Sequence, residues 1–169
     1  MLVILALLAQ APAAAGLLLY KAPAAWTVTP VTSSMRVGEF RLPKADGDSE
    51  DAALVVYYFG GAGGSVQANI DRWVGQISQP DGRASKDVAV VSNRKVNGLA
   101  MTHVDVSGTL VAEVTPGSAE RFNKPGFRLR AAVIETPKGP YFIRVVGPAK
   151  TVARWEKDIE AFLSSVSFK

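Results

Sequence analysis

Hydrophobic and polar positions divide the chain into strand-like runs and two helical stripes. The run from Leu54 to Phe59 stays apolar throughout, which is typical of a strand covered on both faces. Beyond a glycine-rich loop, apolar residues recur at helical spacing at Val66, Ile70, Trp73, Val74 and Ile77. A second stripe near the end of the chain consists of Val152, Trp155, Ile159, Phe162, Leu163 and Val166. These patterns predict two helices that each pack one face on a sheet.

Turn signals between the remaining apolar runs predict antiparallel hairpins. Asn97-Gly98, the preferred dipeptide of a two-residue hairpin turn, separates a run at 88–91 from a run at 99–106. The residues at 137–140 join strands at 129–136 and 141–146, and the polar stretch at 43–51 joins strands at 35–42 and 54–59. Residues 111–126 contain two proline-glycine turns and predict an irregular surface excursion. The expected class is α+β, an antiparallel β-sheet sandwiched by helices.

The first fifteen residues have the pattern of a secretory signal. An apolar run from Met1 to Ala9 leads to the small residues Ala13, Ala14 and Ala15, and the run is too short to span a bilayer. The positive charge that usually precedes such a run is missing apart from the terminal amine, so a weak signal or a start further upstream stays open. We expect a signal peptide at 1–15, a single domain at 16–169, and an exported protein, periplasmic or extracellular.

The composition narrows the available chemistry. The chain has no cysteine and one histidine, which excludes disulfides, thiolate ligands and a multi-histidine metal site. His103, Asp105 and Ser107 alternate along one predicted strand, and groups spaced along a line do not converge on a substrate. We therefore expect no catalytic residue, no metal and no cofactor, although an enzyme acting on a small anionic substrate stays open as the alternative.

The glycine-rich loop before the first helix is the one candidate anion site. Glycine amides and the free N–H groups of a helix N-terminus can point at one anion, and the candidate residues are Gly61, Gly63, Gly64 and Ser65. The loop lacks the lysine of a Walker motif, and a valine replaces the last glycine of a dinucleotide fingerprint. The competing interpretation is a tight turn with Ser65 as the helix cap.

Basic residues gather in the second half of a chain whose net charge is +4. They could contact an anionic membrane surface or a polyanionic wall polymer, or they could form a solvated sheet edge. The set comprises Arg121, Lys124, Arg128, Arg130 and Arg144. We expect no nucleic-acid binding, because the chain has no aromatic-basic motif of the known modules.

Several short motifs are spread over most of the mature chain: Ser33-Ser34-Met35-Arg36, Tyr58-Phe59-Gly60, Gly63-Gly64-Ser65, Ala68-Asn69, Arg72-Trp73, Gln79-Pro80-Asp81-Gly82, Val96-Asn97-Gly98 and Glu135-Thr136-Pro137-Lys138-Gly139-Pro140-Tyr141. With these motifs the chain resembles a group of uncharacterised exported bacterial proteins. More distantly, the order of hairpins and helices resembles the PsbP-like fold, an antiparallel sheet between helices. The resemblance implies an accessory or binding protein on the outer side of a membrane, and no functional residue is carried over.

These observations lead to one functional expectation and one alternative. We expect an exported, non-enzymatic binding or assembly-accessory module whose partner is an unknown envelope protein or small ligand. The alternative is an enzyme or binding protein for a small anionic, phosphate-bearing ligand at the glycine-rich loop.

Overall fold

The computed structural model describes residues 17–31 and 33–169, so the expected signal peptide at 1–15 lies outside the described residues. The elements in chain order are β1 (Leu18–Leu19), β2 (Thr27–Val28), β3 (Arg36–Leu42), β4 (Ala52–Tyr58), α1 (Val66–Val74), β5 (Ile77–Ser78), the 3₁₀ turn η1 (Ser85–Asp87), β6 (Val90–Val96), β7 (Leu99–Leu110), β8 (Lys124–Glu135), β9 (Tyr141–Pro148), α2 (Ala149–Arg154), α3 (Glu156–Ser164) and β10 (Ser167–Phe168). None of the helices among these residues is long and apolar enough to cross a membrane.

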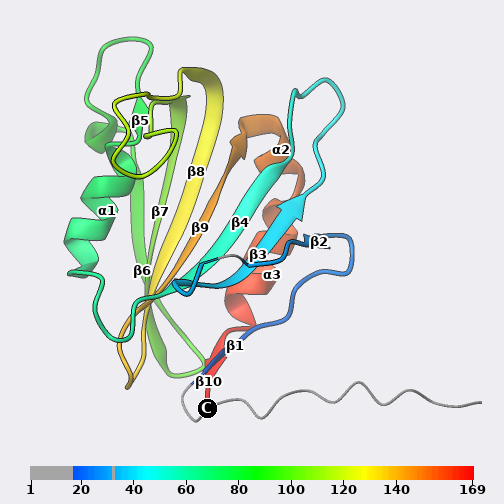
Figure 1. Cartoon of the computed structure of the whole chain (residues 1–169), viewed down its shortest axis with the longest axis vertical. Helices are drawn as coiled ribbons and strands as arrows, with labels where there is room; N and C mark the ends of the chain where they lie inside the picture. Colours follow the sequence, from blue (N-terminus) through cyan, green and yellow to red (C-terminus); the bar gives the residue numbers. More distant parts are fainter. Residues whose placement is uncertain (1–16, 32) are drawn as a thin grey trace, which may run out of the picture.

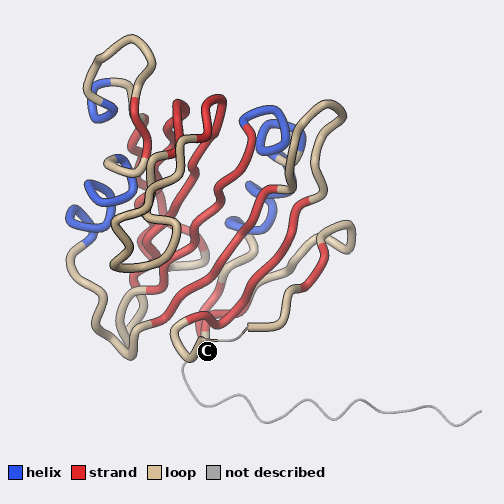
Figure 2. The backbone as a smooth tube through the Cα atoms, turned by 45° about the horizontal axis from the view of Figure 1, so that its top comes forward, coloured by secondary structure: helices blue, strands red, loops and turns tan. Residues whose placement is uncertain are grey.

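Eight strands form one antiparallel sheet in the order β2-β3-β4-β9-β8-β7-β5, with β6 paired to β7 beside β5. Helix α1 lies on one face of this sheet, and α2 and α3 lie on the other (Figure 1). The tube view shows the same arrangement, with helices on both sides of the twisted strands (Figure 2). Because every strand pair is antiparallel and the helices are not interleaved as βαβ units, the expected α+β class is confirmed.

The central strands supply two separate cores, because alternate side chains point to opposite faces of the sheet. The core under α2 and α3 includes Phe40, Leu54 and Ile143 together with Ile159 and Phe162 of α3. The core under α1 consists of Ile70, Trp73, Val74, Ile77, Val104, Val106, Leu110, Ala112, Phe127, Leu129, Ala131, Val133 and Phe142. The apolar run at 54–59 belongs to both cores, which explains why that strand shows no polar alternation.

Both helices are shorter than the apolar stripes predicted. Helix α1 begins after Ser65, whose side chain accepts a hydrogen bond from the amide of Ala68, and it ends at Gly75. Ile77 lies in the core as expected but belongs to strand β5, not to the helix. The single terminal helix that we expected is divided at Trp155, whose ring nitrogen donates to the carbonyl of Pro43. That contact with a distant loop gives no signal in the local sequence.

The predicted hairpins are present, and the two ends of the described chain also pair with each other. Asn97 and Gly98 have φ values of 48° and 84° and connect β6 to β7, as the dipeptide predicted. Strand β1 pairs with β10, a short strand after α3 that the sequence did not predict. The excursion predicted over 111–126 is shorter in the structure, because β8 already begins at Lys124, opposite Leu110 of β7. Between β7 and β8 it contains one isolated bridge, between Glu113 and Arg121.

Candidate binding surfaces

The glycine-rich loop before α1 is shaped by close packing. A Cβ atom on Gly63 would lie 2.7 Å from a ring carbon of Phe142, and one on Gly139 would lie 2.5 Å from the Cα of Gly61. The buried Asn69 side chain donates to the carbonyls of Gly63 and Ser65 at 2.8 and 2.9 Å. These contacts give the loop a structural role, and anion binding at Gly61, Gly63, Gly64 and Ser65 stays a prediction.

The structure does not bring the five expected basic residues together. Arg121 pairs with Glu113, and Lys124 pairs with Glu50 at 2.6 Å. Arg128 and Arg130 lie on the α3 face of the sheet, since their pairing partners alternate with the residues of the α1 core. Arg144 lies on the opposite face, because its neighbours Phe142 and Ala131 belong to the α1 core. The set is therefore no continuous patch.

Arg128 and Arg130 belong to an ionic network between the sheet and α3. Arg128 makes two hydrogen bonds to Asp105, at 2.8 and 2.5 Å, and these bonds raise its pKa. Arg130 lies among three carboxylates and hydrogen-bonds one of them, Glu160, which also binds Arg94. Positive and negative charges are matched here, so the network fastens α3 to β7 and β8 and presents little net charge.

His103 and Asp105 share the α3 face of β7, as alternation predicted. Burial is the largest cause that lowers the pKa of His103, and the neighbouring Arg130 lowers it further. The Nε2 atom is buried and has no hydrogen-bond partner, while Asp105 is held by Arg128 and Arg130. Because the carboxylate binds arginines, it does not orient the imidazole as a catalytic pair requires.

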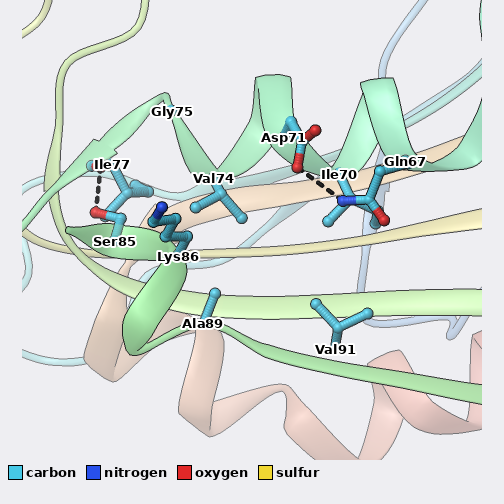
Figure 3. Close-up of a pocket in the computed structure, with 10 residues that line it drawn as sticks. All are labelled: Gln67, Ile70, Asp71, Val74, Gly75, Ile77, Ser85, Lys86, Ala89 and Val91. Carbon is cyan, nitrogen blue, oxygen red and sulfur yellow. Dashed lines mark hydrogen bonds between the residues drawn. The ribbon is translucent and has the colours of Figure 1, made fainter.

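An open groove of about 400 Å³ lies between α1 and the segment that leads into β6. Figure 3 shows Ile70 and Val74 of α1 facing Ala89 and Val91 across this groove, with Ser85 and Lys86 at one end. The walls are mostly apolar, and polar side chains such as Gln67 and Asp71 stand on the rim. The helical stripe predicted the buried residues of α1 but not this groove, which depends on where the strand after η1 returns.

Strand β6 borders the groove and forms an exposed edge of the sheet. Among the described strands it pairs with β7 alone, and six of its seven residues are exposed. Val90 and Val91 are 64% and 49% exposed. Its N–H and C=O groups on the side away from β7 are therefore free to pair with another extended chain. The sequence signal for this edge was the hairpin at Asn97-Gly98, which predicted the strand but not its outer position.

A second hollow, of about 470 Å³, lies at the turn between β3 and β4. Its charged groups are already paired within the chain: Asp51 with Arg41, and Glu50 with Lys124. Within the described residues no group of three or more histidine, aspartate or glutamate side chains is placed to hold a metal ion.

Comparison with known proteins identifies a structure with a similar fold but does not indicate a function for this chain. No protein-family model matches the chain, and no curated protein matches it. A solved structure with a similar fold is that of PA94 from Pseudomonas aeruginosa, described as a protein of unknown function and a putative regulator. The two chains are 11% identical, with a TM-score of 0.53, and the match covers 84% of this chain and 96% of that one. At this identity the likeness supports the architecture alone.

Proposed function

We propose that this protein is a non-catalytic binding module that docks an extended segment of a partner protein along strand β6. The observation that carries the proposal is the combination of a free, exposed strand edge and an apolar groove beside it. An added strand obtains affinity from main-chain hydrogen bonds, and pockets for alternate side chains supply specificity. The groove stands on the side of β6 where every second side chain of an added strand would point.

The register of the hairpin defines which backbone amides of β6 can hydrogen-bond to an added strand. Val96 and Leu99 flank the two-residue turn, and residues in that position exchange hydrogen bonds with each other. Alternation then directs the amides of Val91, Asn93 and Lys95 away from β7. These three amides are the expected docking points.

Charge and polarity define the segment that fits. Arg94 and Lys95 are the charged residues of β6, and the strand carries no acidic residue. Arg94 forms an ion pair with Glu160. Lys95 has no acidic partner within the described chain. The occupant is therefore an extended segment with apolar side chains at alternate positions and an acidic residue opposite Lys95.

Selection from a random peptide library against the folded protein tests the proposal. Peptides with the alternating apolar pattern are expected, and they should lose binding to the Asn93→Pro variant. Proline removes an amide that points away from β7, so the sheet itself keeps its hydrogen bonds. A matched control is Val28→Pro on β2, at the opposite edge of the sheet. Thr29 donates its amide to Glu39 of the neighbouring chain segment, so by alternation the amide of Val28 points away from β3. Peptides that bind Asn93→Pro as well as wild type would overturn the proposal.

Export and membership of the PsbP-like fold are part of the same proposal. The signal-like segment at 1–15 supports export, and an antiparallel sheet with helices on both faces is compatible with a PsbP-like sandwich. The description of PA94 as a putative regulator agrees with a role in binding. N-terminal sequencing of the protein recovered from the cell envelope tests export, with Gly16 as the expected first residue; an uncut Met1 in the cytoplasm would contradict it.

A further inference from the structure

Arg144 is a cation whose charge the described chain does not balance. It lies on β9, with the apolar residues Val55 and Ala131 directly opposite on the two neighbouring strands. Its Nη2 atom donates to the neutral side-chain oxygen of Gln76 at 2.9 Å, and its buried Nε atom has no hydrogen-bond partner. A partly buried guanidinium without a carboxylate is costly, so the site favours an incoming anion.

Two further arginines surround this position. Arg144 donates to Gln76, which lies four positions after Arg72 just past the end of α1, and Arg36 pairs in register with Tyr57, which pairs with Phe142 on β9. Burial lowers the pKa of Arg144 most, and the charges of Arg36 and Arg72 lower it further. Glu39 neutralises Arg36 through a 2.6 Å ion pair. Arg72 has no such partner in the described chain, and its guanidinium donates to the side-chain oxygen of Asn69 at 2.5 Å. Arg72 and Arg144 therefore contribute two positive charges that no neighbouring acid offsets.

Tyr57 completes the surroundings on the same face of the sheet. It lies opposite Arg36 and Phe142 in the register of the neighbouring strands, and it interacts electrostatically with Arg144. Its ring stacks on that of Phe59, and the Cζ atom of Arg36 lies 5.8 Å from the centre of the Tyr57 ring. The phenol O–H can donate a hydrogen bond to an anion.

The other arginine-rich region of the molecule provides the contrast. Arg94, Arg128 and Arg130 lie among Asp105, Glu156 and Glu160, so that cluster already contains its own counter-charges. Arg144 and Arg72 instead donate to neutral amide oxygens, those of Gln76 and Asn69. On the α3 face the corresponding acceptors are carboxylates. Of these two arginine groups in the described chain, the one beside α1 therefore has the unmatched charge.

We propose that Arg144 and Arg72, with Tyr57, form a binding site for a phosphate group that carries two negative charges. A dianion matches the two unpaired guanidinium groups, whose planar donors suit phosphate oxygens. The site lies beside the glycine-rich loop without using its amides, since Asn69 joins Arg72 to the carbonyls of Gly63 and Ser65. It is independent of the docking edge at β6, which lies at the far side of β7 and β8.

Titration with inorganic phosphate at constant ionic strength, followed by NMR of the arginine Nε–H groups, tests the proposal. The Arg144 resonance is expected to shift and to saturate at millimolar phosphate, whereas the resonance of Arg121 stays unchanged. Chloride serves as the control anion. O-phosphoserine distinguishes the source: equal affinity indicates a site for free phosphate, and tighter binding indicates a phosphate ester.

Substitutions assign the binding to these residues. Arg144→Met and Arg72→Met should each weaken phosphate binding about tenfold or more, because each removes charge-assisted hydrogen bonds. Arg121→Met is the matched control and should bind as wild type does. Replacement of an uncompensated cation by methionine is compatible with folding, and the NMR titration needs no variant. Absence of a saturable shift at Arg144, or wild-type affinity in Arg144→Met, would overturn the proposal.

Discussion

Substitution of Gly63 by alanine tests whether packing shapes the loop before α1. Gly63 has a φ of +112°, and an added Cβ would lie 2.7 and 2.9 Å from two ring carbons of Phe142 and 3.0 Å from Phe59. The backbone strain of a side chain at positive φ costs about 1–2 kcal/mol. The steric conflict adds about 1–3 kcal/mol, because the Phe142 ring is fully buried and cannot move freely. The expected loss in the free energy of unfolding is about 2–5 kcal/mol.

Gly82→Ala separates the two contributions. Gly82 also has a positive φ, of +80°, but an added Cβ would meet nothing within 4 Å. This control should lose only the strain of about 1–2 kcal/mol. Urea unfolding followed by tryptophan fluorescence measures both variants, because Trp73 is buried in the core under α1. If Gly63→Ala is no less stable than Gly82→Ala, the packing argument is wrong and the loop glycines require another explanation.

Three further predictions concern a core, a helix cap and the buried histidine. Phe162→Ala should lose about 3–5 kcal/mol of unfolding free energy, since Phe162 is fully buried against Tyr20, Trp26 and Phe40; a loss under half of that by urea unfolding would contradict the described core. Ser65→Ala should lose about 1 kcal/mol with the cap of α1, and an unchanged urea midpoint would argue against that cap. Burial in the folded state lowers the pKa of His103, and the charges of Arg94, Arg130, Asp105 and Glu160 surround it. As the pH decreases, the unfolded chain therefore binds the proton before the folded chain does. The free energy of unfolding should then fall as the pH decreases from about 6.5 towards the lower pKa of the folded state. His103→Gln should flatten this fall in unfolding free energy between about pH 7 and pH 5, and an undiminished slope would show that another group titrates.

Local patterns were sufficient to predict the long strands of the sheet, their hairpins and both helical stripes. The buried side chains of α1 and α3 follow from helical spacing, and the turn at Asn97-Gly98 follows from the need for positive φ at both positions. The end of α1 was misplaced because apolar spacing continued to Ile77. Gly75, where the helix ends, was the available signal.

Features that depend on distant partners gave no local signal. The terminal helix is divided at Trp155, whose ring nitrogen donates to the distant Pro43, and strand β10 pairs with β1 from the other end of the described chain. The basic residues illustrate the same limit: Lys124 is neutralised by Glu50, 74 positions away. A sequence can therefore supply the charges, whereas the fold decides which of them, such as Arg144, stay unpaired.

Site-specific photo-crosslinking in intact cells tests whether β6 docks an extended segment of a partner protein. A photoreactive residue replaces Val91 at the groove, and Val28, an exposed residue of β2, serves as the control position. We expect a discrete crosslinked partner from position 91, attached through an extended segment. It should be absent from position 28 and lost when Asn93→Pro is added. Crosslinks that persist with Asn93→Pro, identical products from both positions, or no product from position 91 would contradict it.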